Sequence, residues 1–105
     1  MSAEHRDPYS FIHSGYDKAQ VVCVLIRMQR PQAARDAHIS DMTGWAVEHG
    51  EGAFTYIHDR HNLHWVTVAD VYDVSLGDWM LARGTHEMFL FNDPDTAFAF
   101  KIQFA

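Results

Sequence analysis

The run QVVCVLIRM, residues 20–28, constrains the fold more than any other part of the chain. Apolar and β-branched residues occupy both its odd and its even positions. This pattern is typical of a strand with both faces covered, and we predict a central strand here. Cys23 lies inside the run and is the chain's single cysteine, which excludes a disulfide within the chain. Its apolar setting indicates a buried side chain in a reducing compartment rather than a reactive thiol.

Periodicity predicts a helix and a hairpin after this strand. Residues 33–49 keep a helical rhythm of apolar positions, and Gly50 ends it. Residues 53–58 and 64–70 then alternate between apolar and polar types on either side of a short polar loop. They are predicted to form two antiparallel strands.

The last third of the chain is predicted to contain two helical segments and two strands. Residues 71–84 suit either a strand or a short helix capped by Ser75, and we favour the helix. Residues 86–91, HEMFLF, form a predicted strand. Asp93 can cap a helical turn, and FKIQF at 100–104 is predicted to close the chain as a strand.

This order of elements predicts an α+β fold of the ferredoxin-like type, with helices on one face of an antiparallel sheet. The domain is expected to span residues 20–105, preceded by an N-terminal arm at 1–19 that docks through Tyr9, Phe11 and Ile12. Helices on one face would leave the other face of the sheet open and apolar. Such a face usually meets another chain or a ligand, so we expect a homodimer or a protein partner.

Charge and composition exclude several classes of protein. The net charge of −6 and the eight scattered basic residues argue against binding of nucleic acid through its phosphates. No stretch reaches the ~18–20 apolar residues that a membrane span needs, and the opening lacks the layout of a signal peptide. We therefore expect a soluble, cytoplasmic protein that binds neither membranes nor nucleic acid.

The acidic residues are concentrated in the second half of the chain. From His61 onward, six carboxylates stand against Arg83 and Lys101. A face of this kind can steer a basic partner or imitate nucleic-acid phosphates, although ordinary solubility charge explains it more simply. The candidate acidic face consists of Asp70, Asp73, Asp78, Glu87, Asp93 and Asp95.

The stretch YIHDRHNLHWV contains three histidines within seven positions. In one hairpin register, His58 and His64 lie directly opposite each other, with His61 and Asp59 in the loop above, and zinc would accept such a set. A shift of one residue places the two rings on opposite faces. No cysteine pair or H-E-x-x-H motif accompanies these histidines, so the favoured interpretation is that they are solvated residues of a turn. A zinc site is the alternative, and the sequence indicates no other cofactor.

Two segments resemble known groups of proteins. The ending MFLFNDPDTAFAFKIQF is similar to the closing segment of many small α+β proteins encoded by bacteriophages. That resemblance implies a host-directed accessory factor, including an inhibitor of bacterial defence. The segment QVVCVLIRMQRPQAARDAHISDMTGWA, residues 20–46, resembles the opening strand and helix of dimeric α+β barrel proteins. It implies a small enzyme or ligand-binding protein with a pocket lined by His38, Trp45, His58 and His64.

No nucleophile elbow, phosphate-binding glycine loop or cysteine–histidine motif is present. The leading hypothesis is therefore a non-enzymatic binding protein that presents the acidic face and an apolar sheet surface to a host protein. The alternative is the dimeric enzyme or ligand-binding protein with the histidine-lined pocket.

Overall fold

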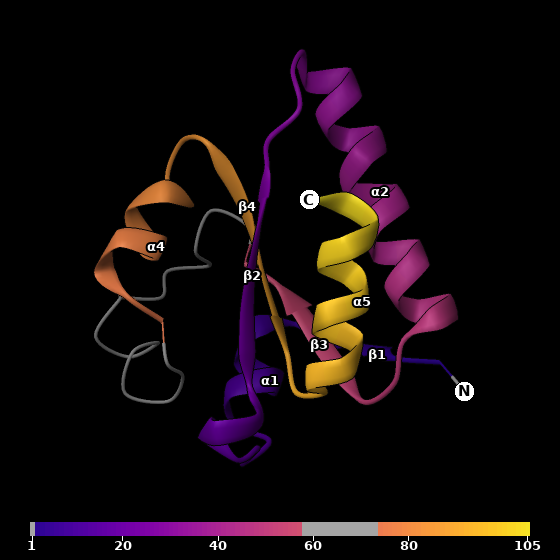
Figure 1. Ribbon diagram of the computed structural model, residues 1–105, viewed down its shortest axis with the longest axis vertical. Helices are drawn as coiled ribbons and strands as arrows, with labels where there is room; N and C mark the ends of the chain where they lie inside the picture. Colours follow the sequence, from indigo (N-terminus) through magenta and orange to yellow (C-terminus); the bar gives the residue numbers. More distant parts are fainter. Residues whose placement is uncertain (1, 58–73) are drawn as a thin grey trace.

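The computed structural model, described for residues 2–57 and 74–105, shows an α+β fold built on a mixed four-stranded sheet (Figure 1). The strand order is β1 (Glu4–His5), β3 (Ala53–Tyr56), β4 (His86–Phe91) and β2 (Val22–Arg27). β4 pairs antiparallel with both of its neighbours, whereas β1 runs parallel to β3. The predicted purely antiparallel, ferredoxin-like sheet is therefore wrong, because the N-terminal arm adds a parallel strand.

Helices cover both faces of the sheet (Figure 1). α2 (Gln32–His49) and α5 (Pro94–Phe104) lie on one face, whereas α1 (Pro8–Ile12) and α4 (Leu76–Leu81) lie on the other. A short 3-10 turn, Lys18–Gln20, leads into β2. The predicted layout with helices on a single face is corrected by this arrangement.

Two apolar clusters fill the space on either side of the sheet. The alternation of β4 divides its side chains between them, since successive residues of a strand point to opposite faces. Phe89 and Phe91 pack with Phe100 of α5 in the first cluster. Met88 and Leu90 pack in the second cluster, which contains Phe11, Val21, Ala53, Ile57, Val74 and Trp79.

The N-terminal arm closes the sheet face that was expected to be open. Asp7 caps α1 by accepting a hydrogen bond from the backbone N–H of Ser10 at 2.9 Å, and Pro8 occupies the first turn. Phe11 of α1 is fully buried in the second cluster. The open apolar sheet surface, which motivated the expectation of a homodimer or partner on that face, is therefore not present in the described residues.

The C-terminal segment forms a helix rather than the predicted turn and strand. The predicted start is confirmed, because Asp93 accepts a hydrogen bond from the Thr96 backbone N–H at 3.2 Å and Pro94 opens the helix. α5 then continues to Phe104. Ala97 and Phe100 are buried and Phe104 is half-buried, so the inward positions are spaced by three and four residues, as in a helix.

Several other predictions are confirmed. β2, α2 and β4 lie where the sequence places them, and Ser75 caps α4 through a 3.0 Å bond from the Asp78 backbone N–H to its hydroxyl oxygen. Among the described strands, β2 lies at the end of the sheet order, beside β4. Odd- and even-numbered residues of β2 are both apolar because helices cover both faces of the sheet, and the number of neighbouring strands does not affect this pattern. The predicted strand at 64–70 lies outside the described residues.

Candidate functional site

A charged cluster lies inside the layer between α2 and the sheet. Glu87 shares its parity on β4 with Phe89, and it is only 2% exposed. Arg35, in the first turn of α2, donates from Nε to Glu87 Oε2 at 2.8 Å and from Nη2 to Oε1 at 3.1 Å. Tyr56 of β3 donates its hydroxyl to Oε1 at 2.7 Å. The carboxylate is thus paired and hydrogen-bonded, as a buried charge requires.

The electrostatics of this cluster favour a structural role. Hydrogen bonding to Glu87 raises the pKa of the Arg35 guanidinium above its ordinary value. Burial, followed by the hydrogen bond to Glu87, raises the pKa of Tyr56. A tyrosine with a raised pKa stays protonated at neutral pH, and the carboxylate is closed off from solvent. The cluster therefore ties α2 to β3 and β4.

Glu87 is therefore buried and does not belong to the exposed acidic face that the sequence predicted. The other described members do not share one surface, because Asp78 lies in the first turn of α4 on one side of the sheet, whereas Asp93 and Asp95 lie at the start of α5 on the other. Asp70 and Asp73 lie outside the described residues. The sequence contains a signal for this burial, because Glu87 is two and four positions before Phe89 and Phe91 and therefore points to the same inward face of the strand.

Two residues of the predicted histidine pocket, His38 and Trp45, pack against Phe104 of α5. The ring of Trp45 meets Phe104 edge-on at 5.8 Å between centroids, and His38 meets the same phenylalanine at 5.9 Å. Nδ1 of His38 is buried and has no hydrogen-bond partner within residues 2–57 and 74–105. His58 and His64, the other two members of the pocket, lie outside the described residues.

The candidate zinc ligands His58, His61 and His64, with Asp59, also lie outside the described residues. Across the part of the chain that the structure describes, no three His, Cys, Asp or Glu side chains are grouped in a way that could hold a metal ion. Cys23 packs against the second apolar cluster, and burial raises the pKa of its thiol to about 12. Such a thiol is a weak nucleophile at neutral pH, and the side chain is half-buried rather than fully buried as predicted.

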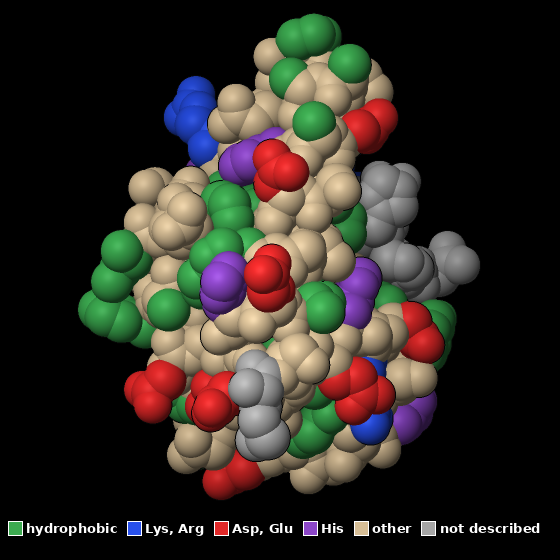
Figure 2. Space-filling view, turned by 90° about the vertical axis from the view of Figure 1, so that its right-hand side faces the viewer, with side chains coloured by type: hydrophobic (Ala, Val, Ile, Leu, Met, Phe, Trp, Pro, Cys, Tyr) green, Lys and Arg blue, Asp and Glu red, His purple; other side chains and the backbone are tan. Residues whose placement is uncertain are grey.

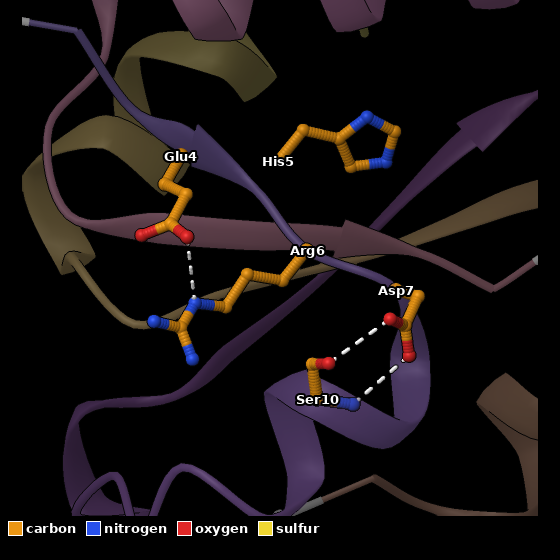
Figure 3. A pocket seen from close by; sticks show the side chains of 5 residues that line it. All are labelled: Glu4, His5, Arg6, Asp7 and Ser10. Carbon is orange, nitrogen blue, oxygen red and sulfur yellow. Dashed lines mark hydrogen bonds and ion pairs between the residues drawn. The ribbon is translucent and has the colours of Figure 1, made fainter.

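A polar hollow of about 400 Å³ lies where β1 passes into α1 (Figure 3). Its charged groups interact with one another: Glu4 Oε1 lies 3.2 Å from Arg6 Nε, and the Ser10 hydroxyl donates to Asp7 at 2.9 Å. His5 points away from the Glu4–Arg6 pair and stacks on Phe54 at 4.8 Å between centroids, and burial lowers its pKa. The hydroxyl proton of Ser10 is directed to Asp7, and no hydrogen bond joins Ser10 to an imidazole among the described residues, so this hollow lacks the arrangement of a nucleophilic site.

The outward surface of α2 and α5 is strongly acidic, and we call it the acidic helical layer. Figure 2 shows the side of the molecule that carries α2, with acidic side chains spread over it and basic ones at its margins. Within residues 32–51 and 93–104 the exposed cation is Lys101, because Arg35 is paired with Glu87 in the interior. The layer contains six carboxylates: Asp36, Asp41, Glu48, Glu51, Asp93 and Asp95.

Two large apolar side chains stand on the outward side of α5. Phe98 and Ile102 are each 68% exposed, and with Asp95 they follow one line along the helix at spacings of three and four residues. We call this line the α5 stripe. A strand over 100–104 would place Ile102 on the same face as Phe100 and Phe104, whereas the helix places it on the opposite side. The spacing of Ala97, Phe100 and Phe104 is the signal that identifies the outward positions.

A second hollow, of about 200 Å³, lies beside the N-terminal end of the α5 stripe. Its lining combines three carboxylates with a histidine and two small side chains: Glu51, Asp93, Asp95, His49, Thr96 and Ala99. The end of α2 meets the start of α5 here, since the Glu51 backbone N–H donates to Thr96 Oγ1 at 2.9 Å. The acidic helical layer is therefore most negative at this end of the stripe.

Comparison with models of known protein families, with curated proteins and with solved structures finds no match to this chain. In the described residues, no helix combines the length and the apolar character needed to cross a lipid bilayer.

Proposed function

We propose that the protein is a non-enzymatic binding protein that acts by contact with another protein through the acidic helical layer. The observation that carries this proposal is the α5 stripe, in which Phe98 and Ile102 are each 68% exposed on one line of a well-capped helix. Both sheet faces are covered by the chain's own helices, so the apolar contact surface lies on a helix exterior.

The chemistry of the stripe suits a protein partner. Fully burying a Phe or Ile side chain contributes about 1.5–3 kcal/mol, so covering the exposed two-thirds of each contributes roughly 1–2 kcal/mol. A few such anchors, surrounded by a polar rim, supply most of the affinity of a typical interface. The surrounding carboxylates would speed the encounter with a basic partner and disfavour acidic ones.

The resemblance of the C-terminal segment to bacteriophage proteins supports a bacterial host protein as the partner. Binding of this kind would make the chain an accessory factor or an inhibitor of a host defence protein. The packing of His38 and Trp45 against Phe104 gives no support to the alternative of an enzyme with a pocket between helices and sheet.

A capture experiment with three baits tests the proposal. The native protein, a Phe98→Ala/Ile102→Ala variant and a Met80→Ala/Leu81→Ala variant are immobilised and exposed to bacterial lysate. Met80 and Leu81 are exposed apolar residues of α4, on the opposite side of the sheet, and provide the matched control. We expect a specific protein that the native bait and the α4 variant retain and that the α5 variant loses. Equal capture by all three baits would contradict the proposal.

A further inference from the structure

Resting on the proposed function, we infer that the partner presents an amphipathic helix with basic residues at one end, which lies along α5. The first argument is shape. The α5 stripe is a ridge on a helix whose main-chain groups are bonded internally, so it offers no edge for an added strand. A ridge of side chains at spacings of three and four residues packs best against the grooves of another helix.

The second argument is the distribution of charge along the stripe. Asp95 precedes Phe98 and Ile102, and Asp93 and Glu51 border the same end. With a rise of 1.5 Å per residue, Asp95 and Ile102 are about 10 Å apart along the helix axis. A complementary helix therefore carries cations about two turns from the apolar residue that covers Ile102.

The helix dipoles do not remove this negative end. The positive N-terminal end of α5 lies beside the C-terminal end of α2, which carries the opposite partial charge, as the Glu51–Thr96 bond shows. The two partial charges offset each other, and the carboxylates determine the local potential. The hollow of about 200 Å³ at this end gives room for a lysine or arginine side chain.

Charge also decides between a basic partner and a second copy of this chain. Two copies joined through the α5 stripe would each bring a layer with six carboxylates and one exposed cation, Lys101, to the contact or its surroundings. Like charges brought together across an interface oppose binding. A basic helix meets the same surface with opposite charge, and the complementarity therefore favours it as the occupant.

The test uses the full-length protein and a labelled synthetic peptide, with binding followed by fluorescence anisotropy. The peptide has about 20 residues, long enough to form a helix, with leucine every third or fourth position and four lysines in its first two turns. One control peptide has the same composition with a central proline, and a second replaces the lysines by glutamate. We expect binding by the first peptide and at least tenfold weaker binding by both controls.

Protein variants locate the contact. Phe98→Ala/Ile102→Ala is expected to weaken peptide binding at least tenfold, because it removes roughly 2 kcal/mol or more of apolar contact. Asp95→Asn is expected to weaken it about threefold at low salt, with the difference shrinking as salt is added. Met80→Ala/Leu81→Ala is expected to bind as the native protein does, and equal thermal midpoints for all variants confirm that they fold.

Three outcomes overturn the inference. They are equal binding of the helical and proline-interrupted peptides, unchanged binding by the Phe98→Ala/Ile102→Ala variant, and self-association in sedimentation that this variant abolishes. The capture experiment distinguishes a failure of the inferred helical partner from a failure of the proposed function. Loss of the captured protein with the α5 variant, without binding of the peptide, leaves the proposed function standing and removes the helix as its partner.

Discussion

Replacement of Arg35 by methionine should destabilise the protein strongly. Its guanidinium holds the carboxylate of Glu87, which is 2% exposed, through two hydrogen bonds of 2.8 and 3.1 Å. Methionine keeps most of the apolar contact of the side chain but leaves the carboxylate with Tyr56 as its remaining partner in this cluster. Removing one partner of a buried pair costs about 3–5 kcal/mol, because it leaves a buried charge uncompensated.

This loss is large relative to the ~5–15 kcal/mol that stabilises a typical domain. For a domain of about 100 residues, each kcal/mol shifts the thermal midpoint by roughly 4–8 °C. The Arg35→Met variant should therefore melt about 15 °C or more below the native protein. Chemical denaturation with urea, followed by tryptophan fluorescence, gives the same difference as a free energy of unfolding.

Two controls separate the buried pair from a general effect of removing charge. Arg27→Met removes an exposed arginine at the end of β2 and should change the free energy of unfolding by no more than about 0.5 kcal/mol. The double variant Arg35→Met/Glu87→Met should recover much of the lost stability, because it removes both charges together. If Arg35→Met costs no more than Arg27→Met, or the double variant is less stable than Arg35→Met alone, the account of a buried, compensated charge is wrong.

Three further predictions follow from the same structure. The pKa of Tyr56 is raised in the folded state, so the unfolded chain loses the hydroxyl proton first as pH rises above about 10, and the free energy of unfolding should fall there. Tyr56→Phe should reduce this fall of the unfolding free energy with pH, as measured by urea titrations at pH 9–11. Cys23 should react slowly with a thiol-specific disulfide reagent in the native protein and faster after unfolding, because the side chain is half-buried and the pKa of its thiol is raised to about 12; equal rates in the two states would contradict this account. Phe100→Ala should cost about 3–5 kcal/mol in thermal or urea unfolding, whereas Ile102→Ala should cost less than about 0.5 kcal/mol; comparable losses would favour the closing strand that the sequence suggested.

Local patterns predicted the elements whose signals are contained within their own segments. The apolar run at 20–28, the helical rhythm of 33–49 and the caps at Ser75 and Asp93 all correspond to observed structure. The end of the chain was misread because FKIQF alternates over five residues, which suits a strand as well as one turn of helix. A window beginning at Ala97 contains the three- and four-residue spacing that decides between them.

The features that the sequence did not predict depend on contacts between distant segments. Parallel pairing of β1 with β3 joins residues about fifty positions apart, and two residues of strand leave no periodic signal. The pair of Arg35 and Glu87 needs a register between a helix and a strand, although each residue alone lies on the inward side of its element. The acidic helical layer likewise combines residues from two helices that are adjacent only in the folded chain.

The apolar run at 20–28 also required covers on both faces of the sheet, which leaves helix exteriors as the apolar surfaces available for binding. Two such surfaces exist in the described residues, the α5 stripe and the exposed side chains Leu76, Met80 and Leu81 of α4. These two surfaces differ in the charge that surrounds them. Among the described residues near α4, Asp78 and Arg83 offset each other, whereas the α5 stripe lies within a layer of six carboxylates. A basic partner is therefore attracted to α5 at long range, and the α4 variant serves as a control because the described residues around it carry no comparable excess of carboxylates.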